Sequence, residues 1–310
     1  MREERVEFFS DAERIVGLLR SPDKSRPPHR AVVQGPGWLG LKEARRNTPY
    51  HRALTAAGIA VLVIDYRGFG DSGGDPTDLL PERQVQDLLN ATTYLTTRRD
   101  IDPTAIGAFG TGGMGGGNAV LLAARDPRIT ATVSQVPVAD GGDWLRSMRT
   151  DEEWAAFQAR LDFDRRQRVA TGQSEMVEPR GDIALVSEQR RRAVEGSLGL
   201  DTRKVDLVSL RSADAILAYR PIDEAYRVSR LLLIAVEDDP VTPARHAEAL
   251  FDAARTPKRL VMQTGVSHYE AYTVYESEVV SEIVAWLDRY LGAPEPINDE
   301  SATSRTLRPD

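Results

Sequence analysis

The chain has 310 residues, of which 41% are hydrophobic, so it can bury a full core as one large domain or as one domain with an insertion. A formal net charge of −7 argues against a nucleic-acid-binding surface, and no apolar run reaches the roughly 18 residues that a membrane-spanning helix needs. The absence of cysteine excludes disulfides and thiolate chemistry, and the four histidines lie too far apart for a zinc motif. We therefore expect a cytoplasmic globular protein that binds no metal, no nucleic acid and no membrane.

Alternating polarity in the first thirty residues predicts an antiparallel hairpin near residues 5–9 and 14–19. From residue 31 onward, short apolar runs alternate with helical stretches, the pattern of buried parallel strands joined by crossover helices. The sequence therefore predicts an α/β protein with a doubly wound, mostly parallel sheet. The six expected strands of that sheet lie at residues 31–33, 59–64, 106–109, 129–133, 231–236 and 259–262.

The strand pattern stops between residues 140 and 221, where tryptophans occur among charged residues at helical spacing. We expect residues 140–221 to form a helical cap inserted between two parts of the core, residues 1–139 and residues 222–292. Residues 293–310 are rich in proline, serine, threonine and acid, and they are expected to form a flexible tail.

The strand at 106–109 runs into Gly-Thr-Gly-Gly-Met-Gly-Gly-Gly-Asn at 110–118, and a helix is expected at 119–124. A strand, a tight glycine turn and a helix are the context of a nucleophile elbow. With Asp-Tyr-Arg-Gly-Phe-Gly-Asp-Ser-Gly-Gly at 65–74 and Val-Pro at 136–137, the segment resembles bacterial α/β-hydrolases of the dienelactone-hydrolase-like and acyl-esterase-like group. The similarity spans roughly residues 5–292 and implies an α/β-hydrolase fold.

Members of that group typically carry Ile-Gly-x-x-Gly-Thr-Ser-Tyr-Ser-Gly-Gly at the elbow. Aligned on Ile-Gly at 106–107, the serine falls on Gly112, which has no nucleophilic atom. The neighbouring Thr111 should point its hydroxyl away from that position, and Ser72 is an ordinary turn residue of the fold. Gly113 and Met114 also depart from the pattern, which favours a natural replacement over a single engineered one, although the origin of Gly112 stays open.

Residues 110–115 also match the Gly-x-Gly-x-x-Gly fingerprint of dinucleotide-binding proteins. That fingerprint should follow the first strand of a βαβ unit and be accompanied by an acid at the end of the next strand. Here it follows a late strand, and the next strand ends in Ser134, Gln135 and Val136. No nucleotide or other cofactor is expected.

The expected acid and base follow the elbow in the order that this fold requires. Asp239 stands in a loop that resembles the Gly-x-x-Asp-x-x-x-Pro segment of the family, and His268 follows the last predicted strand. The resemblance implies that they form the acid and base of a catalytic pair. Glu237 and Asp238 are alternatives for the acid, and Asp239 could instead cap the following helix.

Backbone donors for an oxyanion hole are expected from Gly113 at the elbow and from the loop at 34–40. Pro36 has no N–H to donate, so the second donor is left to Gly37, to Trp38 or to the side chain of Gln34.

A histidine and an acid without a nucleophile can remove a proton and stabilise charge on a carbonyl oxygen, but they cannot form an acyl-enzyme. We expect an enzyme acting on a small-molecule ester or carbonyl compound, most simply by elimination of an acyl or similar leaving group in secondary metabolism. Hydrolysis by activated water, a hydrolase with a mutated serine and a catalytically inactive binding protein are the alternatives. Assembly as a homodimer is left open.

Overall fold

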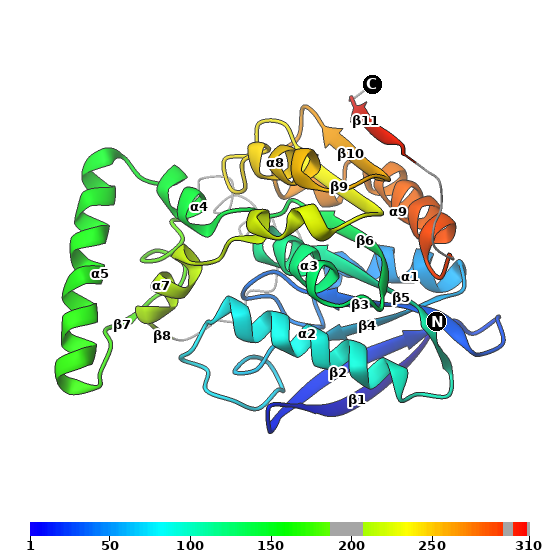
Figure 1. The fold of residues 1–310 in the computed structure, drawn as a ribbon, viewed down its shortest axis with the longest axis horizontal. Helices are drawn as coiled ribbons and strands as arrows, with labels where there is room; N and C mark the ends of the chain where they lie inside the picture. The colour runs from blue at the N-terminus through cyan, green and yellow to red at the C-terminus, as the bar shows by residue number, and fades with distance from the viewer. Residues whose placement is uncertain (187–206, 294–299, 309–310) are drawn as a thin grey trace.

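Figure 1 shows the computed structural model, which describes residues 1–186, 207–293 and 300–308. Its central sheet has nine strands in the order β1-β2-β4-β3-β5-β6-β9-β10-β11. Neighbouring strands from β4 to β11 run parallel, whereas β1 and β2 form an antiparallel hairpin that joins β4. The predicted α/β class with a mostly parallel sheet is thus confirmed. The strands are β1 (Arg2–Ser10), β2 (Glu13–Ser21), β3 (His29–Gly35), β4 (Ile59–Ile64), β5 (Ile101–Thr111), β6 (Ile129–Gln135), β9 (Leu231–Val236), β10 (Lys258–Gln263) and β11 (Ala302–Leu307).

Helices cover both faces of the sheet, because successive side chains of a buried strand point to opposite sides. In β9, Leu232 and Ile234 join one hydrophobic cluster, while Leu231 and Leu233 join another. The first face is covered by α1 (Thr48–Ala56) and α9 (Glu276–Tyr290), and the second by α2 (Pro81–Thr96), α3 (Gly113–Arg125) and α8 (Arg245–Ala253).

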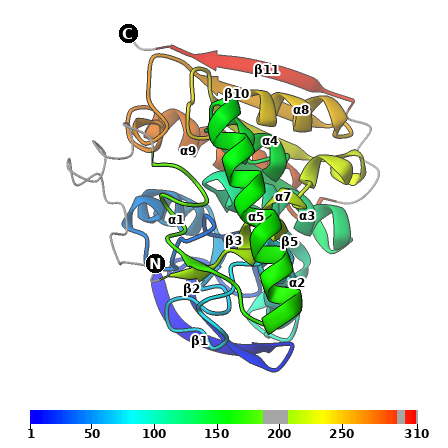
Figure 2. The same ribbon diagram turned by 90° about the vertical axis from the view of Figure 1, so that its left-hand side faces the viewer.

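Between β6 and β9 the chain leaves the sheet and forms the segment at the left of Figure 1. Its longest helix, α5, begins at a capping box formed by Thr150 and Glu153 and ends at Gly172, whose φ is +74°. Seen from the side in Figure 2, α5 crosses in front of the other elements. This segment contains α4 (Gly141–Ser147), α5 (Asp151–Thr171), β7 (Met176–Val177), β8 (Val208–Ser209) and α7 (Arg211–Leu217), and the middle of the predicted cap, residues 187–206, lies outside the described residues.

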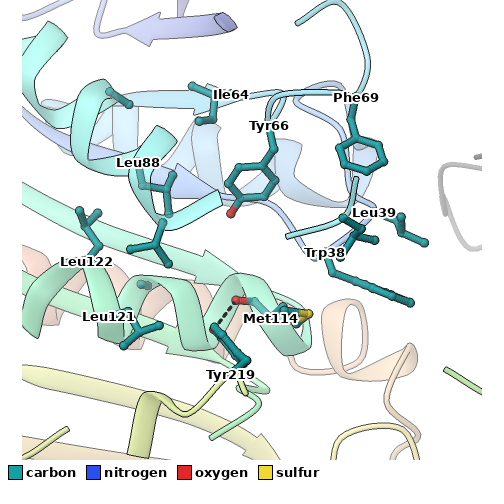
Figure 3. Packing of buried hydrophobic residues seen from close by; sticks show 14 of the residues in the cluster. Trp38, Leu39, Ile64, Tyr66, Phe69, Leu88, Met114, Leu121, Leu122 and Tyr219 are labelled. Carbon is teal, nitrogen blue, oxygen red and sulfur yellow. Dashed lines mark hydrogen bonds between the residues drawn. The ribbon is translucent and has the colours of Figure 1, made fainter. Parts of the chain in front are cut away.

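Helix α3 begins at Gly113, six residues before the predicted start at 119. Its first turn is built of glycines because neighbouring backbone leaves no room for side chains. A Cβ on Gly115 would lie 2.6 Å from the carbonyl oxygen of Pro36, and one on Gly117 would lie 2.4 Å from the hydroxyl of Tyr219. The same hydroxyl donates a hydrogen bond of 3.2 Å to the carbonyl of Met114, drawn as a dashed line in Figure 3.

The expectation of a flexible tail over residues 293–310 is wrong for Ala302–Leu307, which forms β11 on the edge of β10. The unpaired backbone groups of an edge strand offer hydrogen bonds to a further strand, whatever the polarity of its side chains. Leu307 is buried, the carbonyl of Leu307 accepts from Thr264 N at 3.0 Å, and Arg305 pairs with Glu282 at 2.6 Å. Residues 294–299 and 309–310 lie outside the described residues.

The helices of the described ranges include none that is long and apolar enough to cross a bilayer.

Candidate active site

The turn between β5 and α3 has the form of the expected elbow. β5 is the fifth of nine strands, so the turn lies at the centre of the sheet. Gly112 separates β5 from α3 with φ +73°, and the atom nearest to a Cβ built on Gly112 would be the Cα of Gly37, at 3.5 Å. The elbow therefore has room for a side chain that the sequence does not supply.

Neither of the two hydroxyls considered from the sequence stands in for a serine at position 112. The Thr111 side chain is buried within hydrogen-bond reach of Gln34 and Asn47, as expected from the alternation of side chains along a strand. Ser72 donates to the carbonyl of Asp65 at 2.7 Å and accepts from Val16 N at 2.9 Å. Both hydroxyls are engaged away from the elbow.

The structure brings Asp239 and His268 together. Asp239 Oδ2 lies 2.6 Å from His268 Nδ1, and both side chains are buried. The other carboxylate oxygen, Oδ1, accepts hydrogen bonds from the backbone N–H groups of Val241 (2.7 Å) and Thr242 (2.9 Å). Because an ionised carboxylate only accepts, Nδ1 carries the proton of a neutral ring, and Nε2 is the nitrogen that can act as a base.

The other two candidate acids are directed elsewhere. Glu237 and Asp238 are exposed, whereas Asp239 is buried against the imidazole. The alternative in which Asp239 caps the following helix is wrong, because the N-cap of α8 is Ala244 and no side chain caps it. The bonds from Val241 and Thr242 show that Asp239 instead organises the loop before α8 while it pairs with the histidine.

The expected oxyanion donors lie beside the elbow. Gly37, Trp38 and Gly113 all line one cavity with Gly112. Gly113 is the first residue of α3, so its N–H has no acceptor within the helix. The structure removes Gln34 from the candidates, because its side chain is fully buried and binds His51 and Thr111 instead.

The cavity at the elbow has a volume of about 340 Å³ and extends under the cap segment. Trp38 and Trp144 meet edge to face with ring centroids 5.7 Å apart, and Trp144 Nε1 donates to the carbonyl of Val241 at 2.8 Å. This bond ties the cap to the loop that carries Asp239. Two arginines, Arg46 and Arg180, line the cavity, and the lining residues in the described part of the chain include no aspartate or glutamate.

A buried chain of polar groups, not foreseen from the sequence, supports the elbow from behind. Arg20 donates to His51 Nδ1, His51 Nε2 donates to Gln34 Oε1, and Gln34 Nε2 lies 3.4 Å from Thr111 Oγ1. Burial, reinforced by the charge of Arg20, lowers the pKa of His51 to about 3. His51 is therefore neutral, and it holds the strand end that precedes Gly112.

Two further side chains reach the elbow from loops without a recognisable motif. Arg46 lies in the short helix η1 (Arg45–Asn47), and Tyr272 lies in η4 (Glu270–Tyr272), four residues after His268.

No group of three histidine, aspartate or glutamate side chains among the described residues is placed to hold a metal ion.

Comparison with known proteins gives a match to a family model over residues 21–269, and the model is described as X-Pro dipeptidyl-peptidase (S15 family). The quorum-quenching protein AidA of Acinetobacter baumannii (strain MDR-ZJ06) is 30% identical over 294 residues, which cover 92% of this chain and 94% of that protein. A thiohydrolase of Eupenicillium brefeldianum is 27% identical over 303 residues, covering 91% and 92% of the two chains.

Solved structures show the same fold. The α/β-hydrolase GrgF from Penicillium sp. sh18 superimposes with a TM-score of 0.77 at 20% sequence identity, covering 94% of this chain and all of that one (100%). The structure of DcsB in complex with its substrate analogue gives a TM-score of 0.78 at 20% identity and the same coverage. The expected α/β-hydrolase fold is thereby confirmed.

Proposed function

The chain belongs to the family described as X-Pro dipeptidyl-peptidase (S15 family), and from that premise we propose that it is an α/β-hydrolase-fold enzyme that works without a covalent acyl-enzyme. The observation that carries this proposal is the pairing of His268 Nδ1 with Asp239 Oδ2 at 2.6 Å, in a cavity whose elbow residue is Gly112. The base is retained, and the atom that would be acylated is absent.

The reaction that needs only these groups is elimination next to a carbonyl. His268 Nε2 takes a proton from the carbon beside the carbonyl, and the electron pair of that C–H bond becomes a carbon–carbon double bond. The C–O bond to an acyloxy group breaks, and its pair leaves with the carboxylate. Asp239 stabilises the imidazolium, and the N–H groups of Gly113 and of Gly37 or Trp38 stabilise charge on the carbonyl oxygen.

Hydrolysis by activated water is the second candidate. Relatives named as thiohydrolases support it, and one of them matches over 303 residues. In this case His268 takes a proton from water, and the oxygen attacks the acyl carbon directly. The space beside Gly112, where an added Cβ meets nothing closer than 3.5 Å, is sufficient for that water.

The two reactions are separated by the products from 4-acetoxy-2-butanone, a simple β-acyloxy ketone, in water enriched in oxygen-18. Elimination gives methyl vinyl ketone and acetate without label from the solvent. Hydrolysis gives 4-hydroxy-2-butanone and labelled acetate. Methyl vinyl ketone as the enzymatic product supports elimination, and labelled acetate supports the second candidate.

His268→Ala and Asp239→Asn test the dyad in either reaction. Loss of a positioned general base should lower kcat about 10²- to 10⁴-fold in His268→Ala. Asp238→Asn is the matched control, because it removes an exposed carboxylate next to Asp239 and should leave turnover unchanged. Equal turnover by wild type and His268→Ala would leave the dyad without a catalytic role.

A further inference from the structure

A guanidinium and a phenol approach the same point at the elbow. A Cβ built on Gly112 would lie 3.7 Å from Arg46 Nη2 and 3.9 Å from Tyr272 Oη. The same Arg46 nitrogen lies 3.8 Å from a Cβ built on Gly37, on the other side of the elbow. The guanidinium carbon stands 5.3 Å from the centroid of the Tyr272 ring, so the two side chains support each other.

Both groups have hydrogen-bonding capacity that the described residues do not use. Tyr272 is 3% exposed, and its hydroxyl is buried without a hydrogen-bond partner. Arg46 Nε is also buried without a partner, and none of the ion pairs found in the described ranges involves Arg46. Most buried polar atoms in proteins are paired, so these two unpaired atoms on neighbouring side chains require an explanation.

The charged groups around the cavity indicate which kind of ligand would bind to Arg46 and Tyr272. Its described lining contains Arg46 and Arg180 and no carboxylate, although the whole chain carries a formal charge of −7. Burial raises the pKa of Tyr272 to about 12, against the opposing charge of Arg46, so the phenol stays protonated and can donate. Apolar surface from Trp38 and Trp144 faces the same space.

We propose that Arg46 and Tyr272 form a carboxylate-binding subsite at the elbow, beside Gly112. A guanidinium presents N–H donors in a planar fork that matches a carboxylate, and the phenol adds one more donor. This inference rests on the proposed function and deepens it, because the subsite receives the carboxylate that departs when the acyloxy C–O bond breaks. Substrates are then acyl derivatives of carbonyl compounds, and small carboxylates are products that bind.

The test is isothermal titration calorimetry with sodium acetate and sodium benzoate, with benzamide as the neutral analogue of benzoate. Arg46→Gln should weaken carboxylate binding about tenfold or more, and Tyr272→Phe about three- to tenfold, since hydrogen bonds to a charged group are lost. Arg45→Gln, an exposed neighbour in η1, is the matched control and should bind as wild type does. Benzamide binding should not depend on Arg46.

Binding measured without turnover separates this proposal from the proposed function. His268→Ala should retain carboxylate affinity within about threefold, because Arg46 and Tyr272 are unchanged. A benzoate complex should place its carboxylate against Arg46 and Tyr272. The subsite is overturned by absence of saturable binding of both acetate and benzoate, by equal affinity of wild type and Arg46→Gln, or by a carboxylate bound at Arg180 instead. None of these results would bear on the catalytic role of Asp239 and His268. Intact carboxylate binding together with unchanged turnover in His268→Ala would refute that catalytic role and leave the subsite in place.

Discussion

Gly112 differs from the neighbouring glycines because close packing does not require a glycine at its position. A Cβ on Gly110 would lie 2.0 Å from the carbonyl oxygen of Gly115, so that position excludes any side chain. Gly112 has no such conflict, and only its φ of +73° disfavours a larger residue. Packing therefore does not exclude a side chain at this position, and a serine can be placed there.

Restoring that serine tests whether the site lacks only its nucleophile. Gly112→Ser places a hydroxyl in the cavity that His268 also lines, so we expect it to form a covalent adduct with a fluorophosphonate, while wild type forms none. The positive φ should cost about 1 kcal/mol of stability. Intact-protein mass spectrometry detects the adduct, and urea unfolding measures the loss of stability.

Gly113→Ser is the matched control for this experiment, because it adds the same hydroxyl one residue further along, where its Cβ meets Val138 at 3.1 Å. It should remain unlabelled. A stoichiometric adduct on the wild-type chain, mapped to Thr111, Ser72 or another hydroxyl, would refute the absence of a nucleophile.

At the scale of elements, β11 completes the sheet with a strand of polar composition. Deleting residues 302–310 should expose the edge of β10, remove the burial of Leu307 and lower the thermal midpoint by at least about 3 °C. An uncovered edge strand also favours pairing between molecules, so the shortened chain should associate as its concentration rises. Differential scanning fluorimetry and light scattering measure the two effects.

Thr303→Ala changes an exposed side chain of β11 while the backbone pairing with β10 is kept, so it should behave as the full-length protein does. If the shortened chain has the thermal midpoint of the full-length protein and does not associate in light scattering, β11 contributes little to the stability and protection of the sheet edge.

The elements that the sequence revealed are those whose hydrophobic pattern is strong on its own. The buried runs at β4 (Ile59–Ile64) and β9 (Leu231–Val236) were predicted at their observed bounds, because six consecutive apolar residues flanked by turns have the length of a covered strand and are short for a buried helix. The start of α3 was misplaced because glycines disfavour a helix unless close backbone contacts require them. β11 was missed because its stability comes from pairing with a distant strand.

The same distinction applies to the site. Gly112, Asp239 and His268 follow strand ends in a characteristic order, so their approximate location was predictable, whereas their roles remain proposals. Arg46 and Tyr272 come from one-turn helices 226 positions apart in the sequence, and only the folded chain brings them to the elbow. No local pattern could have identified them.

For the whole molecule, the buried His51 predicts how stability depends on pH. Its pKa is lowered from 6.5 to about 3, so in this window the unfolded chain binds a proton that the folded chain does not. The contribution of His51 is fully present above about pH 6.5 and is lost as the pH falls toward 3, at about 1.4 kcal/mol per pH unit.

Urea unfolding at intervals from pH 7 to pH 5 should therefore show a shallower slope in His51→Gln than in wild type. Arg52→Gln, which changes the exposed residue next to it, should retain the wild-type slope. Equal slopes in all three proteins would mean that His51 titrates in the folded state as it does in the unfolded chain.

The pairing of β6 with β9 also determines how accurately the site is assembled. The elbow and Arg46 precede the cap in the sequence, whereas Asp239 and His268 follow it. The two sets of groups are aligned across the sheet by the pairing of Ser134 with Leu233 and of Gln135 with Ile234. A slip of one residue would displace the base from the elbow by about 3.3 Å, farther than the length of a hydrogen bond. The backbone pairing of two strands thus sets how precisely His268 is placed against the elbow, and the cap can vary in length and sequence as long as the bond from Trp144 to the Asp239 loop is kept.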